Sequence, residues 1–120
     1  MCQDWDPDAY IFYNRATRTF EIDESLVNEL KVAPFLVPAC DGSMVLAASG
    51  GHFELVEAGP DDLARHLGFS VGDVIQSVNG QTLLLPDDLF DAMSAQWDAT
   101  SFVVKVKRAG AIITLRYEIV

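Results

Sequence analysis

Hydrophobic and polar residues alternate most regularly near the C-terminal end of the chain. From Phe102 to Lys107, and again from Ile113 to Ile119, every second residue is large and apolar. The two runs flank Ala109 and Gly110, a pair that suits a tight turn. Because successive side chains of a strand point to opposite faces, this pattern predicts an antiparallel hairpin with one buried face.

The rest of the chain predicts shorter elements of both kinds. Strand-like runs lie at 10–13, 17–22, 35–38, 44–48, 52–57 and 73–78. Asp41-Gly42 is expected to form the hairpin turn between two of these runs. Helices are expected from Asp23, from Pro60 to Leu67 and from Pro86 to Trp97, because caps, prolines or acidic first turns begin them. Interspersed strands and helices predict a small α+β domain with a mostly antiparallel sheet.

Length and composition indicate one domain. The chain has 120 residues, of which 50% are hydrophobic, enough to fill a single core. Its net charge of −10 argues against binding to nucleic acid or anionic lipid, since both need a basic surface. No run approaches the ~18 consecutive apolar residues of a membrane span. The first seven residues lack the basic and apolar regions of a signal peptide.

Cys2 and Cys40 are the two cysteines of the chain. Two cysteines are too few for a disulfide scaffold, and their spacing matches no zinc motif. They could pair in an oxidising compartment. Because Cys2 lies near a terminus that is expected to fray, we expect both thiols to be free.

Patterns that carry catalysis or metal binding are weak. His52 and His66 could act as general bases, but the sequence contains no G-x-S-x-G motif that would supply a nucleophilic serine. The pairs Asp61-Asp62 and Asp87-Asp88 diverge by about 100° on a helix, so they suit helix starts better than a metal site. Ser49-Gly50-Gly51 runs into a strand and lacks the Gly-Lys-Ser/Thr of a phosphate loop. The sequence therefore predicts no enzyme, no cofactor and no metal.

A glycine-rich loop precedes an alternating strand at Gly50-Gly51-His52-Phe53-Glu54-Leu55. Glycines let backbone N–H groups turn inward and cradle an anion such as a chain-terminal carboxylate. The strand edge would then pair with the incoming peptide. The alternative is an ordinary loop between two strands.

The segment from Gly68 to Gly80 resembles the signature of bacterial PDZ domains. In that family the signature begins with a glycine followed by an apolar residue. It continues with Gly-Asp-x-Ile and ends with Asn-Gly. Here Gly72-Asp73 would enter a central strand and Asn79-Gly80 would form its exit turn. The resemblance implies a PDZ-like partial barrel with two capping helices over residues 34–120.

Within bacterial PDZ domains, the sequence is most similar to the C protein of the type II (general) secretion pathway. The likeness rests on the strand-helix lead-in at 19–30, on Phe35-Leu36-Val37-Pro38 before an Asp-Gly turn, and on the ending from Asp98 to Ile119. Residues 1–33 would form an N-terminal extension packed on the domain. The chain departs from the family where His52 replaces the glycine that usually starts the binding strand.

The resemblance implies a non-enzymatic interaction module on the periplasmic side of the bacterial inner membrane. Family members link the inner-membrane platform to the outer-membrane secretin, and their PDZ domain is implicated in selecting secreted proteins. A transmembrane helix and another periplasmic region precede that domain, so this chain would be a C-terminal fragment without direct membrane contact. A peptide groove is expected between the strand edge at 53–56 and the second helix. Its expected residues are Gly50, Gly51, His52, Phe53, Glu54, Leu55, Phe90 and Met93.

Other interpretations come from different classes of protein. One is the regulatory PDZ domain of a periplasmic serine protease, in which a protease domain would lie upstream. Another is a scaffold domain whose groove is closed, acting through surface contacts or as a homo-oligomer. The chain carries no lysine at the expected groove mouth, which keeps this interpretation open.

Overall fold

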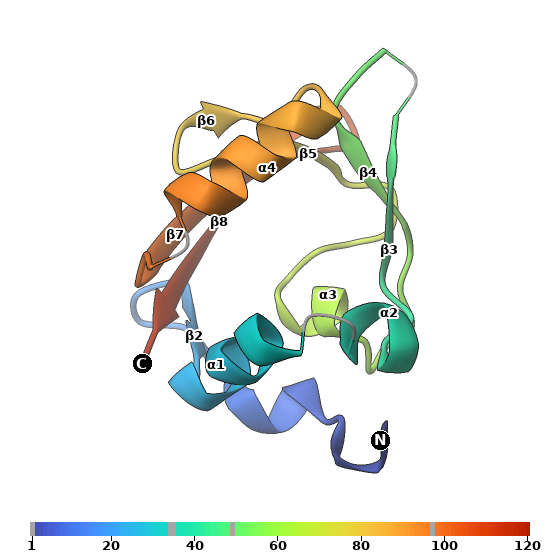
Figure 1. The fold of residues 1–120 in the computed structure, drawn as a ribbon. Coiled ribbons are helices and arrows are strands. Elements are labelled where there is room, and N and C mark those ends of the chain that lie inside the picture. Colours follow the sequence, from blue (N-terminus) through green and yellow to red (C-terminus); the bar gives the residue numbers. More distant parts are fainter. Residues whose placement is uncertain (1, 34–35, 49, 97) are drawn as a thin grey trace.

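A single mixed sheet organises the part of the chain that the structure describes (Figure 1). The computed structural model describes residues 2–33, 36–48, 50–96 and 98–120, with the backbone alone at 86, 89–90 and 93–94. The strands are β1 (Ile11–Asn14), β2 (Thr19–Ile22), β3 (Met44–Ala47), β4 (Phe53–Glu57), β5 (Val74–Val78), β6 (Gln81–Thr82), β7 (Ser101–Arg108) and β8 (Ala111–Ile119).

The strand order is β1-β2-β8-β7-β5-β4-β3, with β6 paired to β5. The pairing of β2 with β8 is parallel, and the other described pairs are antiparallel. The α-helices are α1 (Glu24–Val32), α2 (Leu36–Cys40), α3 (Leu63–His66) and α4 (Pro86–Ala95), and 3-10 turns lie at Cys2–Asp4 and Pro7–Tyr10. Figure 1 shows α4 at one end of the curved sheet and α1, α2 and α3 grouped at the other. The predicted α+β class is confirmed.

The C-terminal hairpin forms as its alternation predicts. β7 and β8 pair in register from Ser101↔Glu118 to Arg108↔Ala111. Ala109 and Gly110 turn the chain with φ values of 50° and 83°, the left-handed geometry of a two-residue hairpin. The inward residues Val104, Val106, Leu115 and Tyr117 are buried and form the centre of the main core.

The N-terminal lead-in shares this core. Strand β2 adds to the sheet beside β8, with Phe20 opposite Tyr117. Asp23 caps α1 by accepting a hydrogen bond from the Ser25 N–H at 2.8 Å, as its sequence predicts. Leu26 of α1 is then buried against the same cluster as the C-terminal hairpin. The lead-in therefore stabilises the sheet from its β8 side.

The structure corrects the strand expected at 35–38. Residues Leu36–Cys40 form the helix α2 instead, and Phe35 lies outside the described residues. Pro38 is tolerated there because the first N–H groups of a helix have no partner within the helix. Asp41-Gly42 consequently connects a helix to β3 and is not a hairpin turn. The turn that precedes β4 lies at the glycines near residue 50.

The structure also corrects the expectation of free thiols. Cys2 and Cys40 form a disulfide, with Cα atoms 5.3 Å apart. The indole N–H of Trp5 donates to Asp41 Oδ1 at 3.0 Å, so the chain start packs beside the end of α2. The separation of 38 residues between the cysteines hides this contact from any local pattern.

An ion pair joins the entry of β5 to the end of β7. Asp73 is 1% exposed, and Arg108 donates from Nε and from a terminal nitrogen to its two oxygens, both at 2.8 Å. The Ser70 N–H donates to the same carboxylate, and Arg108 also reaches the Gly68 carbonyl at 2.9 Å. Burial alone would raise the pKa of Asp73, but these hydrogen bonds and the arginine charge outweigh it and lower that pKa. The Gly-Asp of the PDZ-like signature thus holds three segments together.

The change Asp73→Asn should lower the free energy of unfolding by about 3 kcal/mol, because it leaves the arginine without a matching charge. Urea unfolding followed by circular dichroism measures this loss. Asp91→Asn, at an exposed position on α4, is the matched control and should change stability by less than about 0.5 kcal/mol.

The pH dependence provides a second readout of the same change. Since folding lowers the pKa of Asp73, its contribution is complete above the unfolded value of about 3.9 and disappears as pH falls through the folded value. The difference between wild type and Asp73→Asn should therefore shrink in acid. A difference that is small at pH 7, or that grows on acidification, would contradict this role.

Candidate functional site

Strand β3 forms one edge of the sheet. It ends the strand order, and β4 is its neighbour in that order. Its side chains are unusually exposed for apolar residues, with 45% of Val45 and 53% of Leu46 accessible. Such an edge presents unpaired N–H and C=O groups to an incoming strand.

Strand β4, which was expected to be the open edge, lies inside the sheet. Its Phe53 pairs with Ala47 of β3 on one side and with Ile75 of β5 on the other. Phe53 and Leu55 are both buried, with Leu55 only 1% exposed. The available edge is therefore one strand further along than the sequence suggested.

The register identifies which backbone groups of β3 point outward. Leu55 uses its own N–H and C=O toward the β5 side, bonding to Asp73 O at 2.9 Å and Gly72 N at 2.8 Å. Val45 lies opposite Leu55, so this pair is one of the non-hydrogen-bonded pairs of an antiparallel ladder. The backbone N–H and C=O groups of Val45 consequently face the free edge. Because this orientation repeats every second residue, those of Ala47 face it as well.

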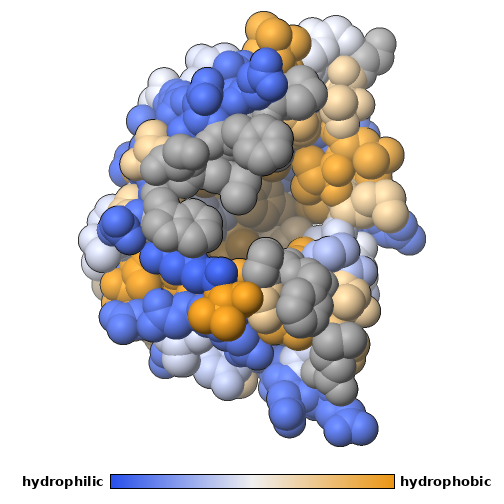
Figure 2. All heavy atoms as spheres, viewed as in Figure 1, coloured by the Kyte–Doolittle hydropathy of each residue, from blue (hydrophilic) through white to orange (hydrophobic). Residues whose placement is uncertain are grey.

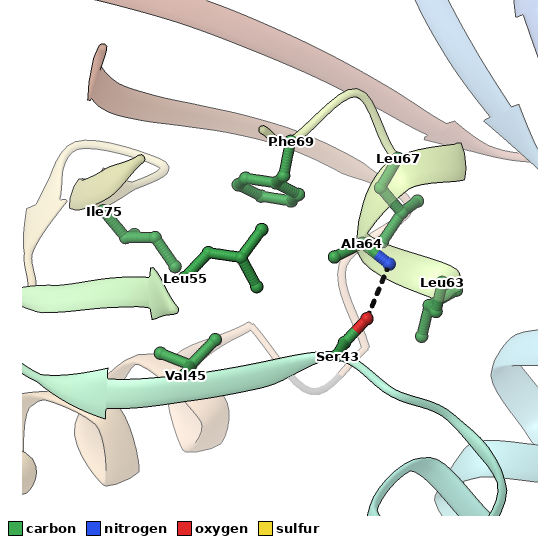
Figure 3. Close-up of a pocket in the computed structure, with 8 residues that line it drawn as sticks. All are labelled: Ser43, Val45, Leu55, Leu63, Ala64, Leu67, Phe69 and Ile75. Atoms are coloured by element: carbon green, nitrogen blue, oxygen red, sulfur yellow. Dashed lines mark hydrogen bonds between the residues drawn. The ribbon is translucent and has the colours of Figure 1, made fainter. Parts of the chain in front are cut away.

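An apolar pocket opens beside this edge. Its volume is about 110 Å³. Figure 3 shows its side chains converging from β3, β4, β5 and α3, and Figure 2 shows a hollow with hydrophobic residues on the side of β3 and β4. The lining residues are Ser43, Val45, Leu55, Leu63, Ala64, Leu67, Phe69 and Ile75. Val45 thus contributes both a backbone edge and a wall of the pocket.

The glycine loop expected to cradle a carboxylate is internally bonded. Gly50, Gly51 and His52 all have positive φ, as a tight connection between β3 and β4 requires. The Gly51 N–H donates to Ala48 O at 3.1 Å and the His52 N–H donates to Leu84 O at 2.9 Å. His52 Nδ1 also lies 2.8 Å from the Leu83 carbonyl. The two His52 contacts fasten the loop to the segment before α4, and the loop's own bonds use two of its N–H groups.

The other expected site residues separate. Leu55 reaches the pocket, while Phe53 packs in a neighbouring cluster with Leu83 and Ala92. Glu54 alternates to the opposite face of β4. The side chains of Phe90 and Met93 lie outside the described residues.

The pocket walls supplied by α3 and the following loop were not predicted as site residues. Leu63 and Leu67 show the i, i+4 spacing of a helix face, and Phe69 follows Gly68, which has a positive φ of 86° just after α3. That spacing predicts burial but cannot separate core from pocket. Within the described ranges, no group of three or more His, Cys, Asp or Glu side chains could hold a metal ion, and no helix could span a membrane.

Comparison with known proteins yields fold neighbours only. No family model and no curated protein matches the chain. Among solved structures, the PDZ domain of EpsC from Vibrio cholerae (residues 204–305) matches with a TM-score of 0.55 at 13% identity, covering 79% of this chain and 92% of that one. The chain has a PDZ fold.

Two further PDZ structures are similar to this chain to a lesser degree. A shorter piece of Vibrio cholerae EpsC (residues 219–305) has a TM-score of 0.51 at 17% identity, covering 65% of this chain and 94% of that one. The HtrA3 PDZ domain bound to a phage-derived ligand (FGRWV) has a TM-score of 0.48 at 18% identity, covering 62% and 77%. The two EpsC structures confirm, at the level of the fold, the resemblance to PDZ domains seen in the sequence.

The pocket makes a direct prediction about two of its walls. Leu55→Ala should lower the free energy of unfolding by about 3 kcal/mol, because it removes a fully buried side chain and leaves a cavity. Val45→Ala, at the half-exposed wall, should change it by less than about 1 kcal/mol. Urea unfolding of the two variants tests this, and equal losses would mean that Val45 belongs to a closed core.

Proposed function

We propose that this PDZ domain is a non-enzymatic interaction module that binds an extended protein segment by adding it to the free edge of β3. The observation that carries the proposal is the position of Val45, whose outward backbone groups border the apolar pocket. A strand paired at this edge would place alternate side chains toward that pocket. The proposed binding residues are thus Val45, Ala47 and Leu55, in place of the glycine loop.

The cellular setting is part of the proposal. We place the domain in a type II secretion component on the periplasmic side of the inner membrane, with the secretin or secreted proteins as partners. Support comes from the sequence likeness of the lead-in and of the C-terminal hairpin, from the fold shared with EpsC, and from the Cys2–Cys40 disulfide, which suits an oxidising compartment. The alternative setting is the regulatory PDZ domain of a periplasmic serine protease. A protease domain encoded upstream of this domain would distinguish that setting from a type II secretion component.

The pocket favours an open groove over a closed scaffold domain. Val45, which is 45% exposed, borders an apolar space of about 110 Å³ at the free edge of β3. Patches of this kind on a protein surface mark interaction sites.

Ala47→Pro should weaken strand addition while preserving the fold. Proline removes an N–H that faces the free edge, a position where sheets tolerate it. The probe is a panel of acetylated and amidated heptapeptides in which Leu, Val, Ile or Phe alternates with Thr or Lys. NMR titration should show shifts along β3 in the wild type and an affinity reduced about tenfold in the variant.

Ala47→Ser is the matched control, since it keeps the N–H and should bind as the wild type does. Thermal unfolding of both variants verifies that they remain folded. Equal affinities for Ala47→Pro and Ala47→Ser would place the bound segment elsewhere. The absence of shifts with every peptide at millimolar concentration would reject strand addition itself.

A further inference from the structure

The segment that leads into β3 has its N–H groups filled by the protein's own carboxylates. The Gly42 N–H donates to Asp62 Oδ1 at 2.9 Å, and the Ser43 N–H donates to Asp41 Oδ2 at 3.0 Å. Asp62 also accepts from the Gly59 N–H at 2.6 Å. Two anionic groups therefore occupy the donors at the start of the edge strand.

These carboxylates lie at one end of the pocket. Asp41 Oδ1 accepts the Leu63 N–H at 2.8 Å while its other oxygen holds Ser43, and both of those residues line the pocket. Burial alone would raise the pKa of Asp41, but hydrogen bonds from Ser43, Leu63 and Trp5 outweigh it and lower that pKa. Asp41 is therefore ionised at neutral pH.

The surrounding chain does not neutralise this end. Residues 36–66 contain five carboxylates and one arginine. That arginine, Arg65, directs its Nε to the Ala58 carbonyl at 3.3 Å. Among the described side chains, no ion pair to Asp41 or Asp62 is formed within 4.0 Å. The negative charge at the start of β3 is therefore not balanced by an ion pair with any described side chain.

The direction of strand pairing decides what a ligand presents at this end. A segment that pairs antiparallel to β3, as β4 does on the other side, runs its carboxyl end toward Ser43. A chain-terminal carboxylate would meet two carboxylates and N–H donors that are already used. A lysine or arginine at the same position would meet complementary charge.

We propose that the groove beside β3 takes an internal, strand-forming segment that places a lysine or arginine beside Ser43, and that it rejects a free C-terminal carboxylate. This inference rests on the proposed strand addition at β3 and names its ligand class. The acidic groups that replace an anion cradle are Asp41 and Asp62.

The test compares three versions of one alternating heptapeptide from the panel, all acetylated. The first ends in lysine amide, the second in the same lysine with a free carboxylate, and the third in glutamate amide. At low salt the lysine amide should bind about fivefold more tightly than the free acid and at least tenfold more tightly than the glutamate peptide, since each close charge contact contributes about this factor. Raising the salt to 0.5 M should shrink both ratios.

The variant Asp62→Asn should reduce the preference for the amide over the free acid. Glu118→Gln changes the net charge equally but lies on β8, separated from β3 by three strands in the sheet order, and should leave the preference unchanged. The salt series on the wild type keeps the test valid if Asp62→Asn does not fold.

The outcomes separate the two proposals. Binding of all versions with the free acid equal or tighter would overturn the inference and leave strand addition standing. Binding of no version would overturn strand addition and the inference with it. Shifts centred on residues 50–52 with the free acid alone would restore the glycine loop as the carboxylate site.

Discussion

The buried ion pair between Asp73 and Arg108 fixes the part of the sheet on which the site depends. It joins the end of α3, the entry of β5 and the end of β7 through hydrogen bonds to Gly68 and from Ser70. The carbonyl of Asp73 then accepts the Leu55 N–H. Leu55 in turn pairs with Val45 and so sets the register of β3. The position of the Asp73 carboxylate therefore determines which backbone groups of β3 point toward the free edge.

The site combines a satisfied interior with an unsatisfied edge. Leu55 is fully buried and Val45 opposite it is half exposed, so a single pair spans the boundary between core and groove. The loops at both ends of β3 are closed by internal bonds, through Asp41 and Asp62 before the strand and through His52 after it. The backbone groups that remain free for a ligand therefore lie in β3 itself. Because they are spaced along a strand, they favour an extended segment over a chain end.

Local signals in the sequence predict much of the fold. The C-terminal alternation, the Asp23 cap and the Gly68-to-Gly80 signature each depend on residues close together in the chain, and each is found in the structure. The open edge of the sheet was expected one strand too far in, at β4, because Asp41-Gly42 looks like a hairpin turn. Its real role, with Asp41 holding Leu63 and Trp5, depends on contacts across 22 and 36 residues. The disulfide was missed for the same reason.

Amide hydrogen exchange of the protein, alone and with the lysine-amide heptapeptide, tests the central claim most directly. In the free protein the Leu46 and Leu55 amides should be protected, while those of Val45 and Ala47 exchange rapidly. The peptide should add protection at Val45 and Ala47, in that alternating pattern. Protection of both amides in the free protein would mean that the edge is already covered. New protection confined to residues 50–52 would contradict strand addition at β3.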